Sequence, residues 1–187
     1  MLRTLLLSAV FMIGAGASAT NVSNLMLNIA KKSMFAHPMA RFVVGDTANY
    51  SLSVSSMTGT MVMKITSVDS SGVMIDQNIT LPMESEDVQE LINPQTGAVI
   101  SITVNGQKQT PPDPNDTQIT SETLATITVP AGTYKCQDVK FHLKTENTDG
   151  EQWVDMDDIP VGGMLKMTTT EQGMAVEADL TSFSNGN

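Results

Sequence analysis

The 187-residue chain has a single cysteine, few aromatic residues and few charged residues. One cysteine, Cys136, excludes an intramolecular disulfide, so stability must come from the hydrophobic core. Aromatic residues make up 4% of the chain and include one tryptophan, fewer than a carbohydrate-binding surface usually presents. Charged residues make up 16%, below the usual figure of about a quarter. Uncharged polar residues must therefore supply much of the surface, which is typical of a β-rich exported protein.

Catalytic and metal-binding motifs are also missing. There is no Gly-x-Ser-x-Gly elbow, no His-Glu-x-x-His and no phosphate loop. Cys136 and His142 would lie roughly 20 Å apart on one extended strand, at ~3.3 Å per residue, which is too far for proton transfer. The acidic residues between 149 and 158 match no calcium loop and are interpreted as a solvated edge. We therefore expect a protein that is not an enzyme and has no metal site and no cofactor.

The charge balance and the hydropathy exclude two classes of partner. Ten basic residues against twenty acidic ones give a net charge of −10, which would be repelled by a nucleic acid backbone or an anionic membrane surface. Beyond the N-terminal leader, no apolar run is long enough to cross a bilayer. We expect a protein that binds no nucleic acid and does not span the membrane.

The N-terminus carries the three parts of a secretory signal peptide. Arg3 supplies the positive charge, residues 5–13 form the apolar stretch, and Ala17–Ala19 is a small-x-small cleavage site. The chain is therefore expected to consist of a signal peptide, 1–19, and a single domain, 20–187. The short, alanine-rich leader favours a bacterial protein that is periplasmic, or secreted, after cleavage.

The mature chain is expected to be mainly β, of the α+β class. Asn24–Phe35 has the apolar spacing of one helix, after which the period changes to two. With no alternation of strands and helices, we expect a curved antiparallel sheet that forms a half-barrel of about nine strands packed on the N-terminal helix. The expected strands lie at about 48–54, 61–66, 73–81, 98–104, 118–129, 133–144, 151–156, 164–170 and 174–183.

Several connections are expected between these strands. The acidic stretch Glu84–Leu91 is interpreted as a short helical turn. Gln107–Thr117 contains three prolines and is expected to be a long exposed loop. Asn105-Gly106, Asp149-Gly150 and Gln172-Gly173 are expected to form tight turns.

Three motifs in the C-terminal third resemble a bacterial periplasmic domain family of unknown function. They are Val129-Pro130-Ala131-Gly132-Thr133-Tyr134-Lys135-Cys136, then Trp153-Val154-Asp155, then Ile159-Pro160-Val161-Gly162-Gly163-Met164-Leu165-Lys166-Met167. Members of that family are similar in fold to the half-barrel envelope lipoprotein carriers. The resemblance implies a half-barrel and assigns no functional residue, because the matched positions are turns and strand anchors.

The chain has fourteen methionines, twelve of them beyond the expected signal peptide. Their adaptable side chains either line a pocket for a lipid chain or fill a core that is poor in aromatics. The first alternative predicts a soluble periplasmic protein that binds an apolar ligand, such as a lipid or a lipoprotein acyl chain. The second predicts an envelope protein–protein interaction module, or a structural module, with a self-filled core. Cys136 should be buried in either case. The residues expected on the concave or core-facing side are Met61, Met63, Ile65, Val73, Ile75, Ile79, Met164 and Val176.

Overall fold

The structure is a computed structural model that describes residues 42–186, except for 83, 96, 97, 112, 114, 146 and 172. The predicted signal peptide and the predicted helix Asn24–Phe35 lie outside the described residues. The described part of the chain contains strands and connecting turns, and no helix in it could cross a bilayer.

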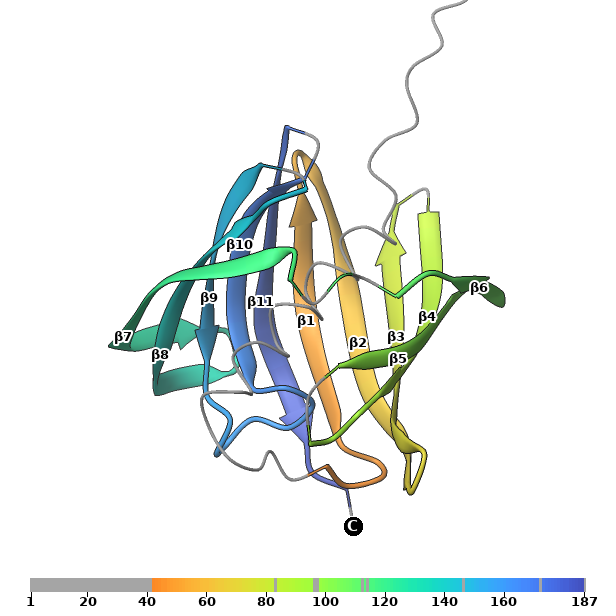
Figure 1. The fold of residues 1–187 in the computed structure, drawn as a ribbon. Coiled ribbons are helices and arrows are strands. Elements are labelled where there is room, and N and C mark those ends of the chain that lie inside the picture. The colour runs from red at the N-terminus through yellow and green to blue at the C-terminus, as the bar shows by residue number, and fades with distance from the viewer. Residues whose placement is uncertain are drawn as a thin grey trace, which may run out of the picture.

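Eleven antiparallel strands form one sheet (Figure 1). Their order across the sheet is β6-β5-β4-β3-β2-β1-β11-β10-β9-β8-β7. The chain therefore makes two meanders that meet where the first strand pairs with the last. The strands are β1 (Thr47–Val54), β2 (Met57–Asp69), β3 (Gly72–Leu81), β4 (Glu84–Ile92), β5 (Val99–Val104), β6 (Gln107–Gln109), β7 (Thr117–Val129), β8 (Gly132–Leu143), β9 (Thr148–Val154), β10 (Met164–Glu171) and β11 (Met174–Ser184).

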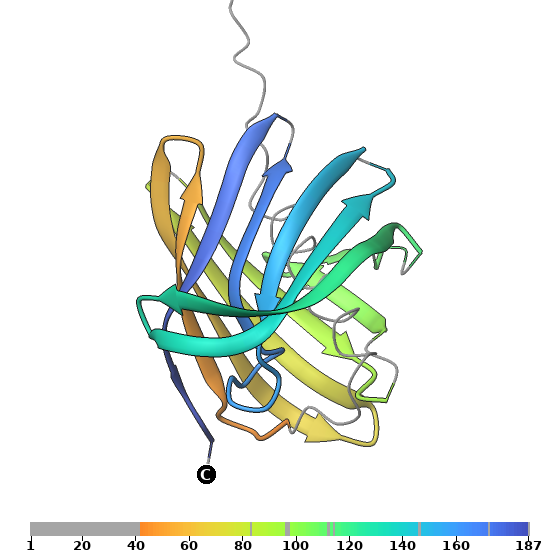
Figure 2. The ribbon, with the colours of Figure 1, turned by 90° about the vertical axis from the view of Figure 1, so that its left-hand side faces the viewer.

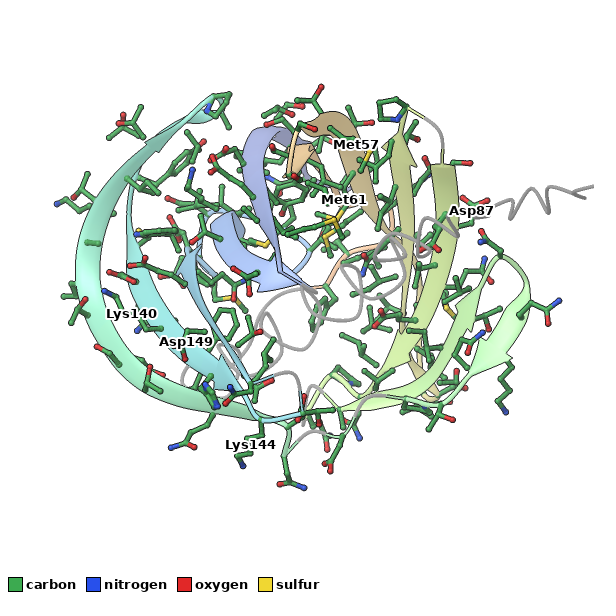
Figure 3. The ribbon with its side chains drawn as sticks, turned by 90° about the horizontal axis from the view of Figure 1, so that it is seen from above. Met57, Met61, Asp87, Lys140, Lys144 and Asp149 are labelled. Atoms are coloured by element: carbon green, nitrogen blue, oxygen red, sulfur yellow. The ribbon has the colours of Figure 1, made fainter. Side chains whose placement is uncertain are left out.

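The sheet curves strongly without closing, and the long β7–β8 hairpin coils around one side of it (Figure 2). Its two outer strands, β6 and β7, are not paired with each other in the described structure, although they are consecutive in the chain. Seen from above, the Met61 side chain lies within the curve and the Lys144 side chain lies outside it (Figure 3). The predicted mainly β, curved antiparallel sheet is confirmed.

Alternation of apolar and polar residues explains why the inner face of the curved sheet is apolar. On β1, Ala48, Tyr50, Leu52 and Val54 are all buried, whereas the residues between them are partly or fully exposed. A period of two places one set of side chains on the inner face of a strand and the other set on the outer face. The same pattern on the neighbouring strands joins their inner residues into one hydrophobic cluster.

Two of the eleven strands were not predicted. The expectation of a helical turn at Glu84–Leu91 is wrong, because this segment is β4 and pairs with both β3 and β5. The expected loop Gln107–Thr117 begins with three residues, Gln107–Gln109, that pair with β5 as β6. The strand count is therefore eleven instead of about nine.

One predicted turn was placed wrongly and another is confirmed. Asn105 and Gly106 have φ values of 49° and 76°, as a tight hairpin turn requires. Asp149 and Gly150 instead lie within β9. Gly150 is needed there for another reason: a Cβ at this position would lie 2.1 Å from Cζ of the buried Phe141 ring.

The turn before β10 has an unusual backbone. Val161, Gly162 and Gly163 all have positive φ values, of 57°, 94° and 75°. A β-branched residue rarely adopts this conformation, so the surrounding packing must stabilise it at Val161. The whole turn is buried, and a Cβ on Gly163 would lie 2.5 Å from Sδ of Met156.

Candidate functional site

The eight residues predicted to face the interior are all buried, with at most 2% of their surface exposed. Six lie on the adjacent strands β2 and β3, where Met61 is paired with Ile79 and Ile65 with Ile75. The other two, Met164 on β10 and Val176 on β11, lie beyond β1 in the sheet. The structure brings all eight into one hydrophobic cluster, so their predicted orientation is confirmed, while their role in ligand binding stays a prediction.

Methionines are concentrated on this inner face. Met61, Met63, Met164 and Met167 are each at most 2% exposed and belong to the same cluster. Tyr50 lies among them in the cluster, and its hydroxyl donates a hydrogen bond to the carbonyl of Met164 at 3.1 Å. Complete burial raises the pKa of Tyr50, so this side chain acts as a neutral donor.

Two glutamines interrupt the apolar inner face. Gln77 on β3 is 1% exposed and is paired with Met63 and Val88 on its neighbouring strands. Gln152 on β9 is fully buried and lies in the corresponding position between two other strands. In the described structure, neither the oxygen nor the nitrogen of either carboxamide has a hydrogen-bond partner. Buried polar groups are rarely left in this state, so these two residues are the least expected feature of the interior.

Two carboxyl groups lie on the same inner wall as Gln77. On β4, Glu86 and Glu90 alternate with outer residues and are only 5% and 0% exposed. Their partners on β3 are Ile79 and Ile75, so they flank Gln77 along the sheet. The interior is thus apolar with a polar strip on one wall, which the sequence analysis did not identify.

The signal for Gln77 was present in the sequence. Val73, Ile75, Ile79 and Leu81 occupy the buried parity of β3, and Gln77 stands at the one position between them that completes the series. A polar residue on an apolar parity indicates either a local irregularity or a functional group. Gln152 gave a weaker signal, because glycine and valine are its nearest neighbours of the same parity.

The single thiol and the His142 imidazole lie on the same strand, β8, six residues apart. Cys136 is 5% exposed, which confirms its predicted burial. Burial raises the pKa of the Cys136 thiol, and the negative charges of Asp155 and Asp138 raise it further. His142 instead contacts Asp149 across β8 and β9, with 2.8 Å between Nδ1 and Oδ1. No group of three or more histidine, cysteine or acidic side chains is placed to hold a metal ion within the described residues.

A cavity of about 460 Å³ lies beside Cys136, lined by residues of β7 and β8 and by the residues at and after the end of β9. Its lining includes Leu124 on β7, which is 89% exposed, and Asp155 and Met156 after β9. Desolvation raises the pKa of Asp155. Its Oδ1 accepts hydrogen bonds from the backbone N–H groups of Asp157 and Asp158. This cavity is open and mixed in character, and nothing in it selects a particular ligand chemistry.

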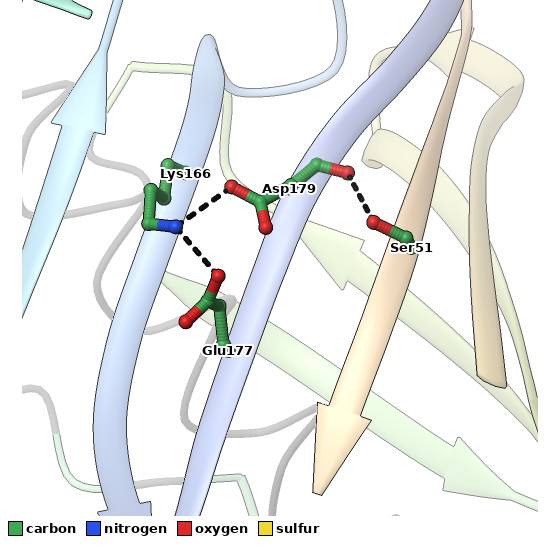
Figure 4. Close-up of polar contacts among 4 residues, drawn as sticks. All are labelled: Ser51, Lys166, Glu177 and Asp179. Carbon is green, nitrogen blue, oxygen red and sulfur yellow. Dashed lines mark hydrogen bonds and ion pairs between the residues drawn. The ribbon is translucent and has the colours of Figure 1, made fainter. Parts of the chain in front are cut away.

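The outer face of β10 and β11 carries an ion-pair cluster (Figure 4). Nζ of Lys166 lies 2.6 Å from Oε1 of Glu177 and 2.9 Å from Oδ1 of Asp179. The hydroxyl of Ser51 on β1 donates to the carbonyl of Asp179. The hydrogen bond from Lys166 lowers the pKa of Glu177, whereas desolvation raises that of Asp179. These contacts join the adjacent strands β10, β11 and β1, so we interpret the cluster as a structural feature of the sheet.

Comparison with known proteins gives only distant likenesses. No protein-family profile matches the chain, and no curated protein matches it. A protein of Bacteroides fragilis described as exported, with a YmcC-like fold, is 12% identical, with a TM-score of 0.40 over 77% of this chain and 97% of that one. MucB is 14% identical, with a TM-score of 0.43 over 93% of this chain and 61% of its own, so the chain spans less than two thirds of MucB. Identities this low assign no functional residue.

Proposed function

We propose that this chain is an exported, non-enzymatic protein of the bacterial periplasm whose half-barrel binds an apolar ligand, such as a lipid or a lipoprotein acyl chain. The observation that carries the proposal is the methionine-rich inner face of a single curved sheet. Methionine side chains are flexible and polarizable, so they can repack around an irregular apolar chain. Concave, mainly apolar surfaces with a few placed polar groups are the usual setting for small-molecule binding.

The burial of this face favours a second candidate function. Met61, Ile65, Val73 and Ile79 are completely shielded from water, as they would be in a permanently filled core. A protein with such a core would serve the envelope as an interaction or structural module. The two candidates differ in how the interior is filled. In a carrier the inner side chains must repack to admit a ligand, whereas in a module they stay packed against one another.

Mass spectrometry of lipid extracts from the natively purified, exported protein tests the proposal. A stoichiometric lipid or acylated species that co-purifies supports the carrier, and its absence from repeated preparations supports the module. Intact-mass measurement of the same sample reports whether residues 1–19 have been removed. If they remain attached, the proposed export with cleavage is wrong.

A pair of variants tests whether the inner face is the binding surface. Met63→Asp places a charge in the interior, whereas Val62→Asp places one at the adjacent, partly exposed residue, which has the outer parity of the same strand. We expect an environment-sensitive apolar dye to bind the wild type and Val62→Asp equally, and Met63→Asp much more weakly. Circular dichroism must show that the variants are folded. Equal dye binding by both folded variants would move the binding surface elsewhere.

A further inference from the structure

Gln77 and Gln152 need hydrogen-bonding partners that the described protein does not give them. We propose that their carboxamides bind the amide groups of a ligand whose apolar chain is linked through amides, that is, an N-acyl amide. This inference rests on the proposed function and names the ligand's chemistry and the residues that select it.

The surroundings of Gln77 leave its carboxamide facing the interior. Its strand neighbours of the same parity, Ile75 and Ile79, are both in the hydrophobic cluster. Its cross-strand neighbours, Met63 and Val88, are 2% and 1% exposed and offer no polar side-chain atom other than a thioether sulfur. A carboxamide placed there has lost its hydrogen bonds to water and has formed none with the described protein.

Gln152 has similar surroundings on β9, at a distant position in the same sheet. It is paired with Val139 on β8 and Met167 on β10, which are both fully buried. Four strands, β2, β1, β11 and β10, lie between β3 and β9 in the sheet order. Figure 3 shows that the sheet curves around its inner face. Because both glutamines are buried and their strands are separated by four others, we infer that they project from different walls of one interior. A ligand in that interior could contact both.

The chemistry of the two side chains favours an amide over other polar groups. A carboxamide has an acceptor oxygen and a donor nitrogen, and a secondary amide offers the matching donor and acceptor. An ester offers acceptors only and satisfies half of each glutamine. Phosphate or carboxylate groups are disfavoured, because Glu86 and Glu90 lie on the strand next to Gln77 and the whole chain is acidic.

The test uses Gln77→Leu and Gln152→Leu in the mature chain, with Gln89→Leu as the matched control. Gln89 is on β4 and is exposed, so the control makes the same change outside the interior. Two probes are titrated by isothermal calorimetry or by dye displacement: N-dodecanoylglycinamide, which has two amides, and methyl tetradecanoate, which has one ester. The urea midpoint of each ligand-free variant is measured in parallel.

We expect each interior variant to bind the amide probe about tenfold more weakly, since a lost hydrogen bond to a buried group has an effect of this order. Binding of the ester should change by less than about twofold. The ligand-free interior variants should be as stable as the wild type or more stable, because leucine removes polar atoms that had no partner. The control should match the wild type in all three measurements.

Three results from the variants would overturn the inference. Unchanged amide binding in both interior variants would show that the glutamines do not contact the ligand. An equal loss for both probes would show a general packing effect. A fall in the stability of the ligand-free interior variants, with the control unaffected, would show that the glutamines are already bonded. If the wild type binds neither probe, both the proposed carrier function and this inference are wrong. If the wild type binds the amide probe and the interior variants bind it equally well, only this inference is wrong.

Discussion

Gly150→Ala is expected to destabilise the protein through a contact with one aromatic ring. The new methyl would lie 2.1 Å from Cζ and 2.6 Å from Cε2 of Phe141, which is 1% exposed and cannot move aside freely. Overpacking of this kind typically costs about 1–3 kcal/mol, and about 0.4–1 kcal/mol is recovered because alanine is less free than glycine in the unfolded chain. The expected net loss is about 1–2 kcal/mol, or about 2–8 °C in Tm for a domain of this size.

A double-mutant cycle separates this clash from other effects of losing the glycine. Leucine lacks the outer ring atoms, so in a Phe141→Leu background the Gly150→Ala change should cost at least about 1 kcal/mol less. Gly106→Ala is the control, because Gly106 has a φ of 76° and no atom within 4 Å of an added Cβ. Its cost should be the same in both backgrounds. Urea unfolding followed by circular dichroism gives the free energies, and an equal cost of Gly150→Ala in both backgrounds would refute the reasoning.

Three further predictions concern polar and thiol groups. Lys166→Met should lower the free energy of unfolding by about 1 kcal/mol at most at neutral pH, since the cluster is partly exposed. The hydrogen bond from Lys166 depresses the pKa of Glu177, so this contribution is present above the ordinary glutamate pKa and is lost as the pH falls through the folded value. The difference between variant and wild type in urea melts should therefore shrink in acid, and a constant difference would contradict this. Asp46 is 3% exposed and accepts hydrogen bonds from two backbone N–H groups, so Asp46→Ala should lower the free energy of unfolding by about 1–3 kcal/mol. Asp46→Asn keeps one acceptor oxygen and should lower it by less, and the reverse order would contradict the assigned hydrogen bonds. Cys136 should react with a bulky disulfide reagent far more slowly in the folded protein than in urea, because it is buried and its thiol pKa is raised by desolvation; complete labelling of the native protein within seconds would be inconsistent with the structure.

The regular part of the fold was predictable because one face of each strand is apolar. Tyr50, Leu52 and Val54 alternate with serine and asparagine, and this period alone places them inside. The same argument oriented Met63 and Ile75 correctly. Burial of this face also specifies the strand register, since a slip by one residue would expose the entire set.

The missed features depend on contacts that a local pattern does not encode. Glu86 and Glu90 occupy inner positions of β4, and two acidic residues on the inward parity conceal the strand signal. Asp149-Gly150 has the composition of a turn, yet the glycine is there because the Phe141 ring on the neighbouring strand occupies the space of a side chain. Gln77 and Gln152 were recognisable only as polar residues among apolar ones, and their lack of partners became evident only from the packing.

Because β1 pairs with β11, the order of the strands in the sheet would stay the same if the chain began at another point. In the described structure the two meanders, β1–β6 and β7–β11, pair with each other only along this seam, and the link between Gln109 and Thr117 joins the two outer edges. At the seam, the backbone N–H of Gly186 lies 2.7 Å from Oδ1 of Asp46, so the two ends of the described chain are adjacent. A circular permutant that joins these ends and opens between Gln109 and Thr117 would keep every strand pair. The two meanders, expressed as separate fragments, would likewise form a split protein that reassembles along β1 and β11.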